Sequence, residues 1–216
     1  MLALRFSLLL LLCYSGLVNA QWTGVALELG NFDSDWEFEN DTREAQISEI
    51  SFQIEEKTAS NLTVGATFGY VDLRVVVDSD SAAQTRKFDG EFIGIYLRQP
   101  FRINDNISLH GAFSIRYTSG RESGADDDRA EIDWTQSVFE LGVSLRYANL
   151  RITAYTAYHD IDGDINADST DVFEMDETLS HGLRFDYFVE KTAFIRFEFV
   201  SGGFEGGYIH FVRRYE

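Results

Sequence analysis

Apolar residues alternate with small or polar residues along almost the entire chain. In residues 60–77, for instance, Leu62, Val64, Ala66 and Phe68 stand at successive second positions. Because successive side chains of a strand point to opposite faces, this period of two predicts strands with one apolar and one polar face. Ten segments follow the pattern: residues 21–30, 46–57, 60–77, 86–99, 106–118, 132–147, 149–159, 174–190, 192–201 and 207–215.

The length of these segments indicates what the apolar faces contact. A tilted strand needs about 9–11 residues to cross a hydrocarbon layer, whereas strands of water-soluble proteins are typically about five or six residues long. Most of the ten segments reach the greater length. A water-soluble protein would also leave many large apolar side chains facing water. We therefore predict that the apolar faces contact lipid.

Short and long connections alternate along the chain. The short ones lie around Ala59, Pro100, Ala148 and Lys191. The longer hydrophilic ones cover residues 31–45, 71–90, 119–133, 159–177 and, as a shorter glycine-rich stretch, 201–207. Short periplasmic turns and long extracellular loops are typical of bacterial outer-membrane barrels. We predict an all-β fold: a transmembrane antiparallel up-and-down β-barrel of ten strands, or alternatively eight, with long acidic extracellular loops and both termini in the periplasm.

The first residues have the features of a secretory signal peptide. A positively charged start precedes the apolar run 6–13, and Val18, Asn19 and Ala20 offer a cleavage site. We predict that residues 1–20 are removed and that residues 21–216 form a single barrel domain. Cleavage would also remove Cys13, the only cysteine, so the mature barrel has no disulfide.

Aromatic residues are expected to form two girdles at the membrane surfaces. Tyr70, Tyr117, Trp134 and Tyr158 are predicted for the outer girdle. The predicted inner girdle consists of Phe101, Tyr147, Tyr187 and Tyr215.

Together, the signal peptide, the alternating hairpins and the aromatic-rich end of the chain, residues 207–215, resemble the outer-membrane β-barrels of Gram-negative bacteria, of the small OmpA-type and porin-like kind. The resemblance covers the whole chain after the signal peptide. It implies residence in the cell outer membrane, contact with lipid and lipopolysaccharide, and recognition of Tyr208, Phe211 and Tyr215 by the barrel-insertion machinery. The chain departs from the usual pattern because Glu216, rather than an aromatic residue, stands last.

The net charge of −18 is concentrated in the hydrophilic segments. Residues 159–177 contain eight Asp or Glu residues and no Lys or Arg. Such a surface would attract cationic peptides, a basic host surface, or cations that bridge to lipopolysaccharide phosphates. We expect no nucleic-acid partner for so acidic a protein, and a monomer.

The most acidic segment also suggests a weak metal site. Asp160, Asp162, Asp164 and Asp168 alternate with other residues, and hard cations prefer several oxygen ligands. The spacing fails the EF-hand pattern, because Gly163 stands fourth rather than sixth and Asp171 replaces the terminal glutamate. We expect at most weak binding of Ca²⁺ or Mg²⁺ here and no other cofactor.

Charged residues of both signs recur on the faces predicted to point into the barrel. Arginine pairs well with carboxylates, so the sequence predicts a lumen network of ion pairs. Its members are Glu28, Glu49, Glu55, Arg98, Arg116, Glu140, Arg146, Arg151, Arg184, Asp186, Arg196, Glu198 and Arg214. The network either fills the lumen or lines a narrow selective path.

Candidate catalytic residues are few. His110 and His210 are predicted to face inward, and the neighbours Ser180 and His181 lie on opposite faces. An omptin-like protease, from a family that resembles this chain in its ten strands and acidic rim, would need His159 with Asp160 or Asp162, and Asp72. The leading hypothesis is a non-enzymatic outer-membrane barrel with a structural, adhesive or surface-interaction role. The alternatives are a small cation-selective porin and an omptin-like protease.

Overall fold

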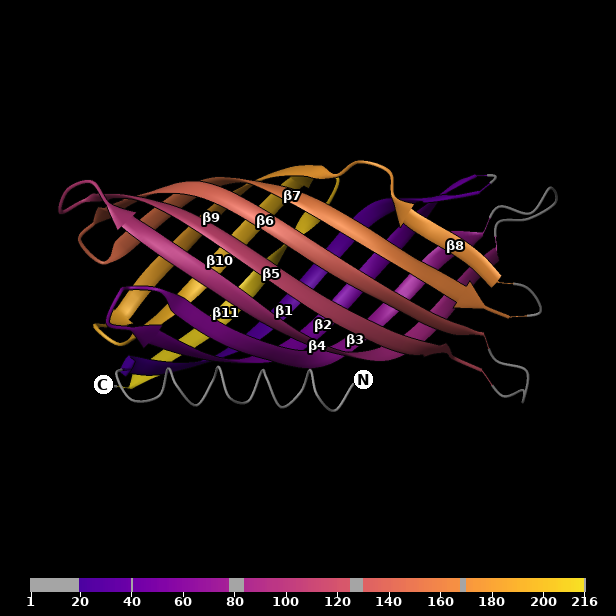
Figure 1. Cartoon of the computed structure of the whole chain (residues 1–216), viewed down its shortest axis with the longest axis horizontal. Coiled ribbons are helices and arrows are strands. Elements are labelled where there is room, and N and C mark those ends of the chain that lie inside the picture. The colour runs from indigo at the N-terminus through magenta and orange to yellow at the C-terminus, as the bar shows by residue number, and fades with distance from the viewer. Residues whose placement is uncertain (1–19, 40, 78–83, 125–129, 168–169, 216) are drawn as a thin grey trace.

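The computed structural model describes residues 20–39, 41–77, 84–124, 130–167 and 170–215. These residues form one antiparallel sheet that closes into a barrel (Figure 1). Its strands are β1 (Ala20–Phe38), β2 (Thr42–Thr58), β3 (Thr63–Val77), β4 (Gln84–Arg102), β5 (Ile107–Glu122), β6 (Glu131–Tyr147), β7 (Leu150–Asn166), β8 (Thr170–Met175), β9 (Leu179–Glu190), β10 (Ala193–Gly202) and β11 (Glu205–Tyr215). Within this part of the chain, no helix is long and apolar enough to cross a membrane. The predicted signal peptide lies outside the described residues except for Ala20, and it stays a prediction.

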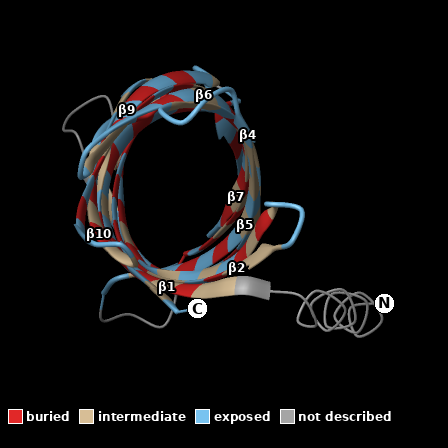
Figure 2. Ribbon diagram, turned by 90° about the vertical axis from the view of Figure 1, so that its left-hand side faces the viewer, coloured by how far each residue is buried: buried red, intermediate tan, exposed pale blue. Residues whose placement is uncertain are grey.

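Closure of the barrel comes from the pairing of β1 with both β2 and β11. Ten strands, β1–β7 and β9–β11, form the ring that is visible along the barrel axis (Figure 2). Each strand is antiparallel to its neighbours, so almost every backbone N–H and C=O in the wall has a partner within the wall. The prediction of a ten-stranded antiparallel barrel is confirmed.

The ring narrows toward one end because β8 takes the place of three strands. β8 pairs with Asp162–Asn166 of β7 on one side and with Trp36–Phe38 of β1 on the other. At that level β9, β10 and β11 have ended, so β1–β7 and β8 close a ring of eight strands. We call this the loop end. The opposite end, with the short turns and with Ala20 and Tyr215, is the turn end.

The strands continue through most of the segments predicted to be long loops. β1 and β2 cover nearly all of 31–45, and β7 and β8 cover most of 159–177. The predicted loop boundaries are therefore wrong. The strands do not end where the outward side chains become polar. At that level the inward side chains become apolar, so each strand still has one face to bury and backbone pairing continues.

Strand β6 illustrates this exchange of polarity. Near the turn end, Leu141 and Val143 are exposed on the outer face, while Glu140 is buried inside. Nearer the loop end, Asp133 lies on the outer face and Trp134 is buried inside. The wall thus has an apolar exterior over the ten-stranded part and a polar exterior over the eight-stranded part. We call the apolar exterior the belt.

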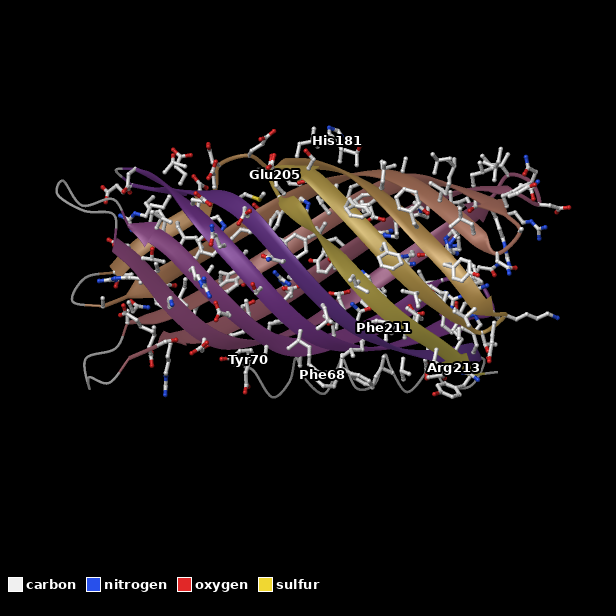
Figure 3. The ribbon with its side chains drawn as sticks, turned by 180° about the vertical axis from the view of Figure 1, so that it is seen from behind. Phe68, Tyr70, His181, Glu205, Phe211 and Arg213 are labelled. Carbon is white, nitrogen blue, oxygen red and sulfur yellow. The ribbon has the colours of Figure 1, made fainter. Side chains whose placement is uncertain are left out.

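The belt runs around the barrel. Phe68, Tyr70 and Phe211 point outward from β3 and β11 (Figure 3). Tyr117 and Tyr158 are also exposed near its loop-end edge, as predicted for the outer girdle. At its other edge Phe101, Tyr147, Tyr187 and Tyr215 are exposed, as predicted for the inner one.

The interior of the loop end is a hydrophobic core. Trp36 stacks on Phe173 with ring centroids 4.5 Å apart and lies 5.7 Å from Trp134. Trp134, predicted for the outer girdle, instead faces inward and is 2% exposed, so that prediction is wrong. We call this cluster the upper core; it comprises Phe32, Trp36, Phe38, Ala45, Ile47, Val71, Leu73, Val75, Phe88, Phe92, Ala130, Ile132, Trp134, Ile161, Ile165, Phe173, Met175 and Phe204. An eight-stranded ring is just wide enough for side chains to fill it, and these side chains do so.

The exchange of polarity predicts opposite effects of one substitution at two positions of β6. Leu141→Arg, on the belt, is expected to lower the free energy of unfolding in lipid vesicles by about 2–4 kcal/mol, the cost of a cation on a lipid-facing wall. Thr135→Arg, on the same face beyond the belt, should change it by less than about 0.5 kcal/mol. Urea titrations followed by tryptophan fluorescence measure both. Equal effects of the two substitutions would contradict the assigned belt.

Candidate functional site

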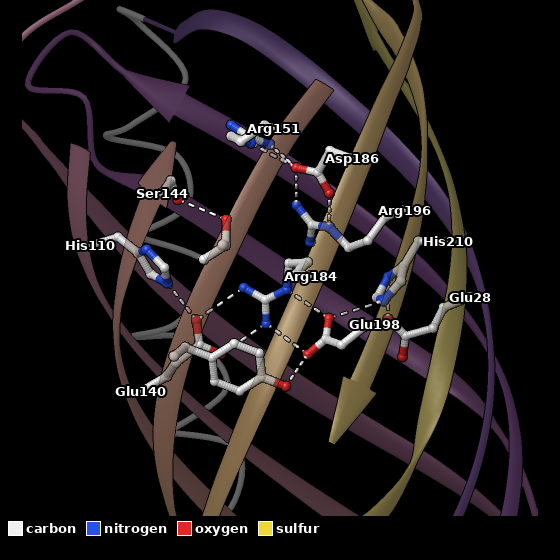
Figure 4. A network of polar contacts seen from close by, with 12 residues as sticks. Glu28, His110, Glu140, Ser144, Arg151, Arg184, Asp186, Arg196, Glu198 and His210 are labelled. Carbon is white, nitrogen blue, oxygen red and sulfur yellow. Dashed lines mark hydrogen bonds and ion pairs between the residues drawn. The ribbon is translucent and has the colours of Figure 1, made fainter. Parts of the chain in front are cut away.

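The interior of the ten-stranded part is a network of ion pairs centred on Arg184 of β9 (Figure 4). Arg184 Nε and Nη2 donate to the two carboxylate oxygens of Glu198 on β10 at 2.7 and 2.8 Å. Its Nη1 and Nη2 donate to Glu140 on β6 at 3.1 and 2.9 Å. One buried guanidinium therefore holds two buried carboxylates through forked contacts, the strong geometry for this kind of pair.

Two histidines extend this network. His110 Nε2 lies 2.6 Å from Glu140, and His210 Nδ1 lies 2.7 Å from Glu28. Glu28 also accepts hydrogen bonds from Ser51 and Gln53 of the adjacent strand β2. These contacts give the buried carboxylates several partners each, as buried charges require.

A second cluster lies nearer the turn end. Asp186 of β9 accepts from Arg196 of β10 at 2.6 Å and from Arg151 of β7. Two smaller pairs complete the interior. Arg116 Nη1 lies 2.7 Å from Glu49, and Glu55 accepts from the hydroxyl of Tyr96 at 2.9 Å, with Arg214 Nε 3.8 Å away.

Two tyrosines reach the network because glycines stand opposite them. Tyr155 is paired across the sheet with Gly182, and its hydroxyl donates to Glu198 at 2.5 Å. A Cβ at Gly182 would lie 2.1 Å from the Tyr155 ring, and a Cβ at Gly65 would lie 2.2 Å from the Tyr96 ring. Only glycine therefore lets each ring lie flat along the wall.

Most of the predicted lumen residues are brought together. Pairing joins Glu28, Glu49, Glu55, Arg116, Glu140, Arg151, Arg184, Asp186, Arg196, Glu198 and Arg214. Arg98 and Arg146 make no ion pair with any described residue. His110 and His210 lie on the inward face, as predicted. They belong to the network together with Tyr96 and Tyr155, and the sequence did not predict this for any of the four. The two histidines lie close to glutamates on neighbouring strands. That proximity is a signal for their role, but it can be recognised only when the strand register is known.

The candidate protease residues do not meet. His159 faces inward beyond the belt, 4.8 Å from the ring of Phe204, whereas Asp72, Asp160 and Asp162 face outward. Burial, with a smaller contribution from the positive charge of Arg116, lowers the pKa of His159 to about 4. His159 is therefore neutral near pH 7 and separated by the wall from the carboxylates that a catalytic pair would need.

The outer surface beyond the belt is acidic. Its carboxylates, which we call the acidic rim, are Asp33, Asp35, Glu37, Glu44, Asp72, Asp89, Glu91, Glu131, Asp133, Asp160, Asp162, Asp164 and Glu174. The hydroxyl of Ser123 donates to Asp89 and lowers the pKa of that carboxyl. No three or more Asp, Glu, His or Cys side chains among the described residues are grouped to hold a metal ion. Asp168, one of the four predicted ligands, lies outside those residues.

No family model and no curated protein matches this chain. Solved structures of outer-membrane barrels are similar to it at low identity. The translocator domain of the autotransporter NalP from Neisseria meningitidis has 14% identity and a TM-score of 0.47, with 99% of this chain and 95% of that chain covered. The outer membrane protease OmpT from Escherichia coli has 9% identity and a TM-score of 0.48, with 90% and 94% covered.

Ail, the attachment invasion locus protein of Yersinia pestis, has 12% identity and a TM-score of 0.39, with 89% of this chain and 99% of that chain covered. At identities and TM-scores this low, nothing about the activity of this chain follows from these proteins. The pairing of the strands within this chain establishes the barrel.

Removal of Arg184 tests the role of the ion-pair network. Arg184→Met should lower the free energy of unfolding by about 3–5 kcal/mol, because Glu140 and Glu198 would stay buried without their cation. Arg213→Met removes an exposed arginine whose Nη1 lies 2.8 Å from Glu190 on the outer face, and should cost no more than about 1 kcal/mol. Both are measured by urea unfolding in the same vesicles.

A rescue variant separates the loss of pairing from the loss of packing. Adding Glu140→Gln and Glu198→Gln to Arg184→Met should recover part of the lost stability, because no buried charge then lacks a partner. If the triple variant is less stable than Arg184→Met alone, the network does not act through charge pairing.

Proposed function

We propose that this protein is an integral, non-conducting β-barrel of a bacterial outer membrane that displays the acidic rim outside the membrane. Both termini would then lie in the periplasm. The observation that carries the proposal is the exchange of polarity along the wall, with the belt around a charged interior and the acidic rim around an apolar interior. The apolar side chains of the belt are suited to contact with the hydrocarbon of a membrane, and the carboxylates of the acidic rim are suited to contact with water.

The upper core argues against the porin alternative. A conducting lumen needs a continuous polar path, with charged side chains that contact the passing ion. Here Trp36, Trp134 and Phe173 fill the eight-stranded ring, and each is at most 2% exposed. In the ten-stranded part, Arg184 is paired with Glu140 and Glu198 and so does not offer a free charge to a passing ion. The charged interior therefore serves mainly to stabilise the wide ring.

The separation of His159 from Asp72, Asp160 and Asp162 argues equally against the protease alternative. A general base must lie within hydrogen-bond reach of the water that it activates, and its partner must orient it. Residues on opposite faces of one wall do not meet that requirement. We therefore favour a structural or surface-interaction role over an enzymatic one.

The acidic rim is the surface best suited to an interaction. Among the described residues, its carboxylates lie on β1–β4 and β6–β8, and the cations on the same face are Arg74, Lys87 and Arg121. A surface of one charge sign attracts oppositely charged partners over several ångströms and concentrates them. Cationic peptides, a basic host surface, and divalent cations that bridge to lipopolysaccharide phosphates fit this field.

Planar bilayers test the closed lumen. The purified protein should give no stepwise conductance, because the upper core leaves no continuous polar path. OmpT-like peptide cleavage should be absent as well. Stepwise currents that persist in independent preparations would contradict the closed barrel. Retention of the folded, heat-modifiable form on gel electrophoresis shows that the silent protein is intact.

Binding of an oligolysine peptide to vesicles that carry the protein tests the acidic rim. The triple variant Asp160→Asn, Asp162→Asn and Asp164→Asn should weaken binding about tenfold, and the binding should fall steeply as salt is added. A control neutralises two carboxylates, Glu56 and Glu190, which lie on the outer face at the turn end. If the control weakens binding as much as the rim variant does, the rim is not the binding surface.

A further inference from the structure

The interior of the turn end contains two neighbouring cavities. One cavity of about 460 Å³ lies at the mouth, and a second of about 150 Å³ lies deeper, beside Arg184 and Arg196. Both are lined by Lys57, Pro100, Ser108, Ser144 and Arg151, so they are parts of one space. We call this space the vestibule. A third cavity of about 200 Å³ within the ion-pair network shares Arg98, Arg184 and Arg196 with the deeper one. It reaches Phe32 and Phe204 of the upper core, which closes the space toward the loop end.

Cations outnumber carboxylates in its lining. The basic residues at the mouth and walls are Lys57, Arg98, Arg102, Arg146, Arg151 and Arg214, whereas the acidic ones are Glu55 and Asp105. Asp105 is already paired with Arg102. Lys57, Arg98 and Arg146 make no ion pair with any residue that the structure describes. The excess positive charge is therefore concentrated where the barrel opens.

Aromatic rings contact two of these arginines. The guanidinium of Arg214 lies 4.3 Å from the Trp22 ring and 4.9 Å from the Phe194 ring, and that of Arg146 lies 5.0 Å from the Phe188 ring. A ring binds the flat face of a guanidinium and leaves its N–H edges for other partners.

Two of these arginines are weakly paired. The Nε atoms of Arg98 and Arg214 are buried and have no hydrogen-bond partner among the described residues, and a Glu55 oxygen lies 3.8 Å from that of Arg214. An acceptor with several oxygens, placed in the vestibule, would offset the excess charge and accept from guanidinium N–H groups that face the cavity.

We propose that the vestibule is a binding site for a multivalent oxyanion, either a phosphate ester or an oligocarboxylate. Forked arginine donors match phosphate and carboxylate oxygens in geometry as well as charge. Because the vestibule is closed toward the loop end, it is a blind site and not an entrance to a channel. The anion would come from the turn-end side, either as a soluble molecule or as the headgroup of an anionic lipid.

Isothermal titration calorimetry of the detergent-solubilised protein with inorganic pyrophosphate and, separately, citrate tests the site. Binding of at least one of them is expected. The double variant Arg98→Gln and Arg146→Gln should weaken it by about tenfold or more, the effect of losing two charge-assisted contacts. Neither arginine forms an ion pair with a described residue, so the variant should retain the heat-modifiable folded form.

The matched control is Arg121→Gln, which removes an exposed arginine at the loop end, paired there with Glu131 at 3.0 Å. It should leave the affinity unchanged. Absence of binding by both anions, or equal binding by the double variant and the wild type, would overturn the proposal. Because the titration is done in detergent, failure of this site leaves the proposed membrane role untouched, and the reverse also holds.

Nanodiscs distinguish the two sources of the oxyanion. Phosphatidylglycerol in the disc should compete with pyrophosphate if the lipid headgroup reaches the vestibule, and phosphatidylcholine should not. If neither lipid changes pyrophosphate affinity, the ligand is a soluble oxyanion. Either result supports an oxyanion site, provided that the double variant has lost binding in the same discs.

Discussion

The width of the ring at each level is the constraint on which the rest of this structure depends. A ring of ten strands is too wide for aliphatic side chains alone to fill, whereas a ring of eight is just narrow enough. In the wide part, long side chains such as Arg184, Glu140 and Glu198 reach across the interior and meet in pairs. In the narrow part, Trp36 and Trp134 meet directly. The ring changes from ten strands to eight where β8 takes the place of β9, β10 and β11.

Ion pairs in the wide part are stable because each buried charge has several partners. Desolvation of two charges often costs as much as their attraction returns, unless the geometry is good and the remaining donors are satisfied. Arg184 meets this condition with four contacts to two carboxylates, and Glu198 gains a further donor from Tyr155. The narrow part needs no such arrangement. Its side chains are apolar, and burial alone stabilises them.

The sequence predicted the wall better than it predicted the interior. Period-two alternation identified the strands and their short turns, because alternation follows directly from strand geometry. It did not reveal that the two faces exchange polarity. In β3 the apolar residues move from even positions, as at Phe68 and Tyr70, to odd ones, as at Val71 and Leu73. That shift of one residue is the signal that could have found the upper core, and it also explains why Trp134 was misplaced.

The partners of the interior ion pairs could not be predicted from any local sequence pattern. Arg116 meets Glu49, which is 67 residues away in the chain, and only the register of the intervening strands brings the two together. β8 was concealed for a related reason. It lies in an acidic segment whose charges suggest a loop, although Phe173 and Met175 stand on either side of Glu174, two positions apart as in a strand.

The electrostatic field has opposite signs at the two ends of the barrel. At each end it comes mainly from the charges that lack a partner of opposite sign. Within the network, hydrogen bonds join Arg116, Arg151, Arg184 and Arg196 to carboxylates, so the fields of these arginines are largely cancelled a few ångströms away. The carboxylates of the acidic rim have few cations beside them, and Lys57, Arg98 and Arg146 have no carboxylate partner among the described residues. The overall charge of −18 therefore understates the asymmetry. An acidic exterior at one end and a basic interior at the other would select partners of opposite charge from the two sides of a membrane, and the paired network and the upper core keep those two sides apart.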